Sequence, residues 1–425
     1  MPRRLPAALA VFALILAGAC SRPAERPAHA APPAQSAPPA ATPAVTLPPP
    51  VPGGADFSKE VRLLYRVVAC GGDEPVAPLD AAVVDDYCKW LIPRLAEWER
   101  DYLSKARPFL AARRPASLPA SVVYPFGGGD LLSALTTYPD ALEYTTLSLE
   151  HAGDPQRLAG LDKAQLASNL AEVRRRIKGL FTYAESTSEN MMQLEKSDVP
   201  GQLAFFLVAL RAHGLEPVSL RFFRLEPDGS LHYLTADEIA AGEKTRARKL
   251  SKVWVSPEFS VSFSNAELQF KPRGKDGPLR VHRHIAVNLS DDHLKGDPAV
   301  LKHLEAKGEV AAMTKAASYL LWAEGFTTVR DYLLGHMVFM ISDSTAMAPS
   351  DAARAGFEME TWGKFSGPFL LARKSVADEY RKLWAEQPSR DLPFRYGYPD
   401  ASGQNHMVIT RPRPKAPAPA AGGRP

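Results

Sequence analysis

The chain has 425 residues, 45% of them hydrophobic, and its 51 basic and 47 acidic residues leave a formal net charge of +4. A chain of this length and composition can bury one large core or two ordinary ones. The charges are interspersed and their excess is small for the length, so no basic face indicates nucleic-acid binding, and we expect no nucleic-acid partner.

Residues 1–20 are typical of a secretory signal peptide. Arg3 and Arg4 precede an apolar run from Leu5 to Leu16, and small residues lead from there to a cysteine. The run is shorter than the about 20 residues that cross a bilayer as a helix. It therefore predicts export rather than a membrane span.

The signal segment ends in LAGAC, at Leu16 to Cys20, and this ending resembles the lipobox of bacterial lipoproteins. That family prefers Leu, Val or Ile where this chain has Ala17. The resemblance implies a lipid on Cys20, and Ser21 in place of Asp implies an outer-membrane lipoprotein that faces the periplasm or the cell surface. The alternative is cleavage by the ordinary signal peptidase, which leaves Cys20 as a free thiol or removes it.

The 39 prolines crowd into the two ends of the chain. Residues 21–56 are almost entirely Pro, Ala and small polar residues, which predicts a disordered tether, and residues 411–425 form a second disordered tail. Between them we expect a single α/β globular domain over residues 57–410.

The first part of that domain, residues 57–118, is expected to be helical, with an amphipathic helix over 81–103. The chain has three cysteines. In an exported chain they divide naturally into Cys20 for the lipid and a disulfide between Cys70 and Cys88. Two reduced, buried cysteines are the alternative.

A strand, a glycine turn, a helix and a second strand follow in one continuous unit. Ser121 to Phe126 is a short β-type run, Gly127 to Gly129 is a turn, and Asp130 is expected to cap the next helix. Glu143 to Leu149 is the second strand, and Glu150 stands at its carboxyl end.

The remaining pattern alternates helices with strands. We expect helices over 162–181, 200–213, 298–322 (weakened near Gly308), 327–334 and 376–386, and strands over 215–224, 231–234, 253–255, 259–270, 279–289, 337–341, 357–362 and 406–410. The strands of residues 215–290 look antiparallel. The predicted fold class is α/β, with a Rossmann-like mixed sheet opened by the strand-GGG-helix-strand unit and an antiparallel β insertion.

The glycine turn is the first candidate site. A strand, glycines, a helix and an acid about 20 residues on is the outline of dinucleotide sites and class I methyltransferases. Gly127, Gly128 and Gly129 are then ligand-binding candidates, with Glu150 as the acid. Asp130, however, places a carboxylate where a phosphate would bind. The alternative is a turn that only joins a strand to a capped helix.

Asp343, Ser344 and Thr345 are the second candidate, because they leave the carboxyl end of an apolar strand. If this strand and the one before Asp130 are parallel, Asp130 and Asp343 open onto the same edge and can bind a metal or sugar or transfer protons. The alternative is an ordinary turn.

Two further clusters carry weaker signals. His282 and His284 share one face of a predicted strand, but no third ligand follows closely, so we expect a solvated face and no metal site. Tyr396 and Tyr398 are candidates for stacking a sugar or peptide, with a plug at the edge of the core as the alternative. Motifs of hydrolases, zinc proteases and phosphate-binding loops are absent, and we expect no cofactor.

Four segments resemble a family of uncharacterised bacterial exported proteins and lipoproteins: YPFGGGD at 124–130, LE at 149–150, KAASYLLW at 315–322 and DST at 343–345. The resemblance covers most of residues 57–411. It implies a shared fold and export, and it brings no known reaction with it.

The leading hypothesis is a lipid-anchored cell-envelope protein that acts in binding or envelope organisation, through a protein or cell-wall partner that the sequence does not identify. The alternative is an exported enzyme with a methyltransferase-like site at the GGGD turn, for which the catalytic candidates are Asp130, Glu150, Asp343 and Ser344. A second alternative is a protein that binds carbohydrate or peptidoglycan.

Overall fold

The computed structural model describes residues 54–182, 198–244, 246, 248–249, 255–256, 258–315, 320–343, 347–365, 374–396 and 405–414. All of these residues belong to one compact unit. The signal segment, Cys20 and most of the tether and the tail lie outside the described residues.

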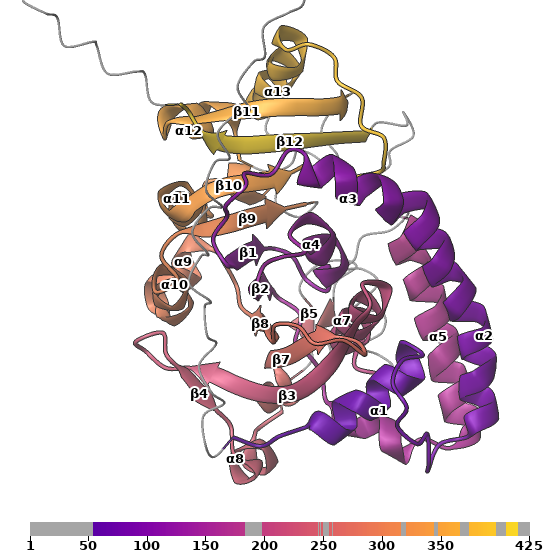
Figure 1. The fold of residues 1–425 in the computed structure, drawn as a ribbon. Helices are drawn as coiled ribbons and strands as arrows, with labels where there is room; N and C mark the ends of the chain where they lie inside the picture. Colours follow the sequence, from indigo (N-terminus) through magenta and orange to yellow (C-terminus); the bar gives the residue numbers. More distant parts are fainter. Residues whose placement is uncertain are drawn as a thin grey trace, which may run out of the picture. The chain divides into compact units, whose positions relative to one another are not determined.

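A ten-stranded mixed sheet organises the fold (Figure 1). Its strands lie in the order β11 (Phe357–Lys364), β12 (Asn405–Pro412), β10 (Met337–Ser342), β9 (Val310–Thr314), β1 (Ser121–Pro125), β2 (Glu143–Ser148), β8 (Arg280–Ala286), β7 (Asn265–Pro272), β3 (Leu215–Leu225) and β4 (Leu231–Tyr233). A separate pair consists of β5 (Arg248–Lys249) and β6 (Val255–Ser256). The expected α/β class with a mixed sheet is confirmed.

The five central strands, from β10 to β8, are parallel to one another. The outer strands pair antiparallel. All five central strands therefore end at one edge of the sheet, which we call the carboxyl edge, and begin at the opposite one, the amino edge.

Helices cover both faces of the sheet, because successive residues of a central strand point to opposite faces. The core that contains Val122 and Tyr124 is covered by α1 (Ser58–Val68), α2 (Ala81–Trp98), α3 (Ser104–Ala111), α4 (Leu131–Thr137), α5 (Lys163–Thr182) and α7 (Gly201–Ala212). The core that contains Val123 is covered by α9 (Asp291–Gly296), α10 (Ala299–Glu305), α11 (Thr327–His336), α12 (Pro349–Arg354) and α13 (Lys374–Glu386). Figure 1 shows α9, α10 and α11 on one side of the strands and α2 and α5 on the other.

β1, α4 and β2 form the predicted strand, glycine turn, helix and strand. The Asp130 carboxylate accepts a hydrogen bond from the backbone N–H of Ser133 and so caps α4, as predicted. Gly128 has φ 49° and Phe126 has φ 58°. Glycine adopts this left-handed conformation freely and phenylalanine resists it, so the turn holds Phe126 under strain.

α7 lies in the interior of the protein. Its first ten residues, 201–210, are all buried, which agrees with the apolar LAFFLVAL segment. The short helix α8 (Ala236–Ala241) lies instead on the surface beside the β3–β4 hairpin. Among the described residues, no helix has both the length and the apolar composition needed to cross a membrane.

A disulfide joins Cys70 to Cys88, as the cysteine count predicted. It ties the segment after α1 to the middle of α2. In the entropy model a loop of this length contributes about 3 kcal/mol to stability.

The long helix expected over 298–322 is wrong. In the described part of this range α10 ends at Glu305, and after Gly308 (φ 67°) the chain enters β9, the strand between β10 and β1. Ala311 and Ala312 favour helix in isolation, but every residue of β9 is buried, and small apolar residues fit a central strand that is covered on both faces.

The expected antiparallel pairing within 215–290 is confirmed for β3, β4, β7 and β8. The other side of β8 pairs parallel with β2, so β8 also belongs to the parallel centre of the sheet. The expected strand over 259–270 begins late, because residues 261–263 form a 3-10 turn before β7.

Candidate functional site

The carboxyl ends of β1, β9 and β10 lie side by side, because these strands are parallel neighbours. The chain leaves β1 through α4 on one face of the sheet and leaves β9 through α11 on the other. Such a topological switch point is where open α/β sheets bind ligands. Asp130, Lys315 and Asp343 follow the three strands, so Asp130 and Asp343 share one edge, as the sequence predicted.

A buried polar cluster fills the switch point. Lys315 Nζ donates a hydrogen bond to Ser133 Oγ over 3.0 Å and lies 3.6 Å from Asp130 Oδ2. The Tyr124 hydroxyl donates to the same carboxylate oxygen over 3.0 Å. All four side chains are buried. These four residues, which we call the switch-point cluster, hold the loop after β1 against the end of β9.

The polarity of the switch-point cluster argues against a nucleophilic serine. A catalytic serine needs a neighbouring base that takes its proton. Here Ser133 Oγ accepts a hydrogen bond from Lys315 Nζ, and Lys315 forms an ion pair with Asp130. The arrangement is a closed ion pair that stabilises the loop.

The glycine turn does not fit a nucleotide phosphate. α4 has only seven residues, and the Asp130 carboxylate already accepts an N–H at its N-terminus, which is where a phosphate would bind. A Cβ atom on Gly127 would lie 2.7 to 2.9 Å from atoms of Tyr124. Gly127 is therefore required by the packing of Tyr124, which is a structural role.

Lys315 is the member of the cluster that sequence reasoning missed. It follows β9, and the sequence predicted a helix there, so no strand end was expected at this position. The signal that could have found it is the short apolar run from Val310 to Met313, soon after Gly308, which is the length of a strand.

A second set of polar side chains lies at the end of β2 and the start of α7. Glu150 is only 6% exposed, and no described residue forms a hydrogen bond or ion pair with its carboxylate. Ser148 Oγ and both amide atoms of Gln202 are buried and likewise find no hydrogen-bond partner in the described part of the chain. A bond from the Leu203 N–H to the Ala152 carbonyl (3.4 Å) ties α7 to the loop after β2. We call Ser148, Glu150 and Gln202 the unpaired polar group.

The unpaired polar group is informative because buried polar atoms are nearly always hydrogen-bonded in proteins. Leaving one unpaired costs about 1–3 kcal/mol. Ser148 and Gln202 carry such atoms at the carboxyl edge, and together with the mostly buried Glu150 they make this edge a candidate ligand site.

The solvated face expected for His282 and His284 is wrong, because α7 covers β8 there. Both side chains are buried, and Phe206 of α7 packs against both rings. Thr146 Oγ1 lies 2.9 Å from His282 Nε2 and 3.1 Å from His284 Nδ1, and His284 Nε2 donates to the Glu150 carbonyl over 2.7 Å. Burial lowers the pKa of His284 to about 4 and the pKa of His282 well below its usual range. Both rings are therefore neutral at neutral pH.

A pocket of about 390 Å³ lies where the loop after β2 meets the start of α7. It is lined by residues 199–201, which lead into Gln202, and by His151, which follows Glu150. The His151 ring stacks on Phe259 with centroids 3.8 Å apart. Burial is the main cause that lowers the pKa of His151 to about 4, so this ring is neutral at neutral pH.

Asp343 lies at the end of β10 and is 1% exposed. Its backbone N–H donates to the Thr314 carbonyl over 3.3 Å. Ser344 and Thr345, the other predicted residues of this loop, lie outside the described residues. Among the described residues, no group of three or more His, Cys, Asp or Glu side chains is placed to hold a metal ion.

Tyr396 is buried behind the switch-point cluster. Lys315 Nζ lies 5.3 Å from its ring centroid, and burial raises the pKa of its hydroxyl well above the usual range. That hydroxyl has no hydrogen-bond partner among the described residues. A ring in this position offers no stacking face to solvent, which favours the interpretation as a plug of the core; Tyr398 lies outside the described residues.

A buried charge network crosses β2, β8 and β7 on the other face of the sheet. Glu143 pairs with Arg283 and with Lys307 Nζ (2.5 Å), and Arg283 Nε lies 2.8 Å from Glu267 Oε2. Burial alone raises the pKa of Glu143, but the charges of Lys307 and Arg283 outweigh it and lower the pKa to about 2. Two acids and two bases thus balance one another.

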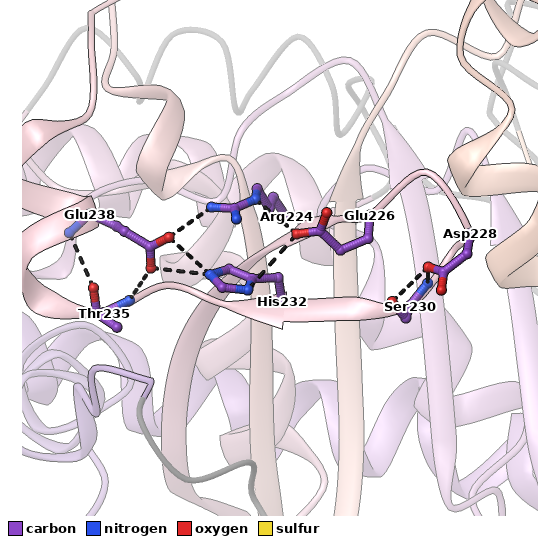
Figure 2. A network of polar contacts seen from close by, with 7 residues as sticks. All are labelled: Arg224, Glu226, Asp228, Ser230, His232, Thr235 and Glu238. Carbon is purple, nitrogen blue, oxygen red and sulfur yellow. Dashed lines mark hydrogen bonds and ion pairs between the residues drawn. The ribbon is translucent and has the colours of Figure 1, made fainter.

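The free edge of the sheet carries a surface network on the β3–β4 hairpin (Figure 2). Glu238 Oε1 accepts a hydrogen bond from Arg224 Nη1 and lies 2.9 Å from His232 Nε2. The same carboxylate forms a capping box with Thr235, and Glu226 lies on the other side of His232. The acids and bases satisfy one another, so this network stabilises the hairpin and is no candidate site.

Comparisons with known proteins give no relative: no family model, no curated protein and no solved structure matches the chain.

Proposed function

We propose that the chain is a lipid-anchored cell-envelope protein whose α/β domain binds a small, hydroxyl-bearing ligand at the carboxyl edge of its sheet. The unpaired polar group carries this proposal. Its three side chains lack partners among the described residues, and the chain neighbours of Glu150 and Gln202 line a pocket of about 390 Å³, which is within the usual size range of small-molecule sites.

The chemistry of the group defines the class of ligand. The Glu150 carboxylate accepts hydrogen bonds from hydroxyl or amino groups, whereas the Gln202 amide and the Ser148 hydroxyl both donate and accept. A ribose or another sugar presents this mixture of groups. The neutral His151 and Phe259 rings offer an apolar wall beside them.

The envelope assignment is supported by the cysteines. The disulfide accounts for Cys70 and Cys88 and belongs to an oxidising compartment. Cys20 is then the one cysteine left, at the end of a segment that resembles a lipoprotein signal. If the lipid assignment is right, the protein partitions into the detergent phase and Cys20→Ala moves it to the aqueous phase. Recovery of the unmodified protein in the aqueous phase contradicts the anchor.

We further propose that the fold is Rossmann-like. In order of occurrence in the chain, the parallel strands β8, β2, β1, β9 and β10 read 3-2-1-4-5, which is the order of the doubly wound dinucleotide-binding fold. The antiparallel strand β12 lies between β10 and β11. Class I methyltransferases also have an antiparallel strand in this position.

The strand order favours a second candidate function, an exported enzyme of methyltransferase-like build. Glu150 follows the second parallel strand, where the acid of such sites is expected. The phosphate-binding role of the glycine turn is not part of this candidate, because Asp130 occupies the start of α4. The double variant Asp130→Ala with Asp343→Ala tests it: retained folding with loss of turnover supports an enzyme, and mere instability contradicts one.

The test of the ligand site is a thermal-shift titration of the full chain with S-adenosylmethionine, adenosine and N-acetylglucosamine. We expect one of these probes to raise the melting temperature of the wild type. Glu150→Gln should abolish the rise, and Glu305→Gln, an exposed acid on α10, should keep it. The proposal is wrong if none of the probes shifts the wild type, or if Glu150→Gln responds as strongly as Glu305→Gln.

A further inference from the structure

The amino edge of the sheet holds a pocket of about 610 Å³ with an unusual charge. It is formed where α3, the ends of α4 and α7, the start of β3 and β8 and the end of β7 meet. Six of its lining residues are cationic: Arg107, Arg114, Arg211, Arg273, Lys275 and Arg280. Among the described residues that line it, only Asp140 is acidic. The whole chain carries a formal charge of only +4, so six cations against one acid are more than an even distribution of charge would place here.

Two of these cations have a structural task. Arg114 Nη1 donates to the Thr137 carbonyl over 2.9 Å, and its Nη2 lies 3.6 Å from Asp140 Oδ2. Arg280 Nη1 donates to the Pro139 carbonyl over 2.5 Å. These contacts satisfy carbonyl groups at the end of α4, where cations are favourable.

Arg211, Arg273 and Lys275 have no such task. Arg273 and Lys275 are exposed, and among the described residues neither forms an ion pair. The Nε atoms of Arg211 and Arg280 are buried and find no hydrogen-bond partner in the described part of the chain. The exposed Arg273 and Lys275 therefore remain available to a bound anion.

His213 positions Arg107 without adding charge. Its Nε2 lies 3.2 Å from the Leu132 carbonyl and donates to it, so Nδ1 is the acceptor for Arg107 Nη2 at 3.3 Å. Burial, helped by the charge of Arg107, lowers the pKa of His213 to about 3. The ring is therefore neutral at neutral pH and holds the guanidinium of Arg107 at the rim of the pocket.

We infer that this pocket binds a phosphate-bearing ligand with more than one negative charge. Like charges in one pocket repel one another, and a bound polyanion removes that repulsion. Guanidinium groups are planar forks that match phosphate oxygens in pairs, and five of the six cations are arginines. The volume suits a diphosphate with an attached group. This site lies at the opposite edge of the sheet from the proposed ligand site, so either can fail without the other.

The first test is a calorimetric titration of the full chain with inorganic pyrophosphate at low salt. The double variant Arg273→Gln with Lys275→Gln removes two exposed cations of the pocket. The control, Lys59→Gln with Lys295→Gln, removes two exposed cations elsewhere and gives the same net charge. We expect the pocket variant to weaken pyrophosphate binding about tenfold for each charge removed, and the control to bind as the wild type does.

Two sources of phosphate are separated by a second arm. Co-sedimentation with phosphatidylcholine vesicles, with and without phosphatidic acid, measures binding to a lipid headgroup. Retention on phosphatidic acid that the pocket variant loses and the control keeps assigns the phosphate to a lipid; pyrophosphate binding without it assigns a soluble ligand. The inference is overturned if pyrophosphate does not bind, if both double variants bind it equally, or if a single-stranded oligonucleotide binds more tightly than either phosphate probe with the same sensitivity to the pocket variant.

Discussion

The two edges of the sheet treat charge in opposite ways. At the carboxyl edge, Lys315 is buried against Asp130 and Ser133, and the cation is matched by an anion. At the amino edge, six cations face one acid in a pocket that solvent reaches. The first arrangement neutralises itself, and the second does not.

This contrast distinguishes charges that stabilise the fold from charges that can bind a ligand. A charge that is paired within the protein stabilises a loop or a helix end and has little left to offer a ligand. Open α/β sheets usually bind ligands at the carboxyl edge, and here the unpaired polar group at that edge is uncharged except for Glu150. We therefore expect a polar, hydroxyl-bearing ligand at one edge and an anion at the other.

The largest expected effect comes from breaking the charge pair at the carboxyl edge. Lys315→Met leaves the Asp130 carboxylate buried without its cation, and such a loss costs about 3–5 kcal/mol of unfolding free energy. Chemical denaturation measures it. Adding Asp130→Asn removes the stranded charge and keeps the helix cap, so the double variant should recover most of the loss. If Lys315→Met lowers the free energy of unfolding by less than about 1 kcal/mol, the ion pair does not hold the loop after β1 in place.

Acid should destabilise the carboxyl edge through His284. Its pKa is about 4 in the folded protein and 6.5 in the unfolded chain, so below pH 6.5 the unfolded chain binds more protons and stability falls as the pH falls. Between pH 7 and pH 5 we expect this group to cost about 2 kcal/mol. The free energy of unfolding of His284→Gln should depend less on pH over this window than that of the exposed-residue variant His293→Gln. Equal slopes would contradict the buried, neutral state of His284.

Gln202→Leu tests the uncharged polar side chains at the carboxyl edge. It replaces a buried amide without partners by an apolar side chain of similar size, so the ligand-free protein should gain about 1 kcal/mol of stability. The same variant should lose the thermal shift caused by the hydroxyl-bearing ligand. A destabilised Gln202→Leu protein would mean that the amide already has a partner in the folded chain.

The smallest effect is expected at the amino edge without ligand. Arg273→Gln with Lys275→Gln removes exposed charges that repel their neighbours, so stability at low salt should rise by about 0.5 kcal/mol or less. The rise should vanish at high salt because ions screen the repulsion. A clear loss of stability would show that these side chains hold the fold together.

Local signals in the sequence predicted much of the carboxyl edge. The unit from Ser121 to Glu150 formed as expected, with Asp130 as the cap, because turn, cap and strand depend on neighbours in the chain. The disulfide followed from counting. Lys315 was missed because the apolar run before it also suits a helix. The run forms strand β9 because it lies between β10 and β1 in the sheet, and the sequence does not show this position.

Features that depend on distant segments were not predictable in this way. The six cations of the amino-edge pocket come from segments between residues 107 and 280 and look interspersed in the sequence, which is why no basic face was expected. The burial of His282 and His284 depends on α7, a helix about seventy residues earlier, packing across β8. Sequence periodicity reports the face of a strand and not what covers it.

Anomalous diffraction from crystals of the protein soaked in tungstate tests whether the unmatched cations at the amino edge bind an anion. We expect an anomalous peak in the pocket within hydrogen-bond distance of Arg211, Arg273 or Arg280. A peak beside Lys315 at the carboxyl edge, with none in the amino-edge pocket, would contradict it.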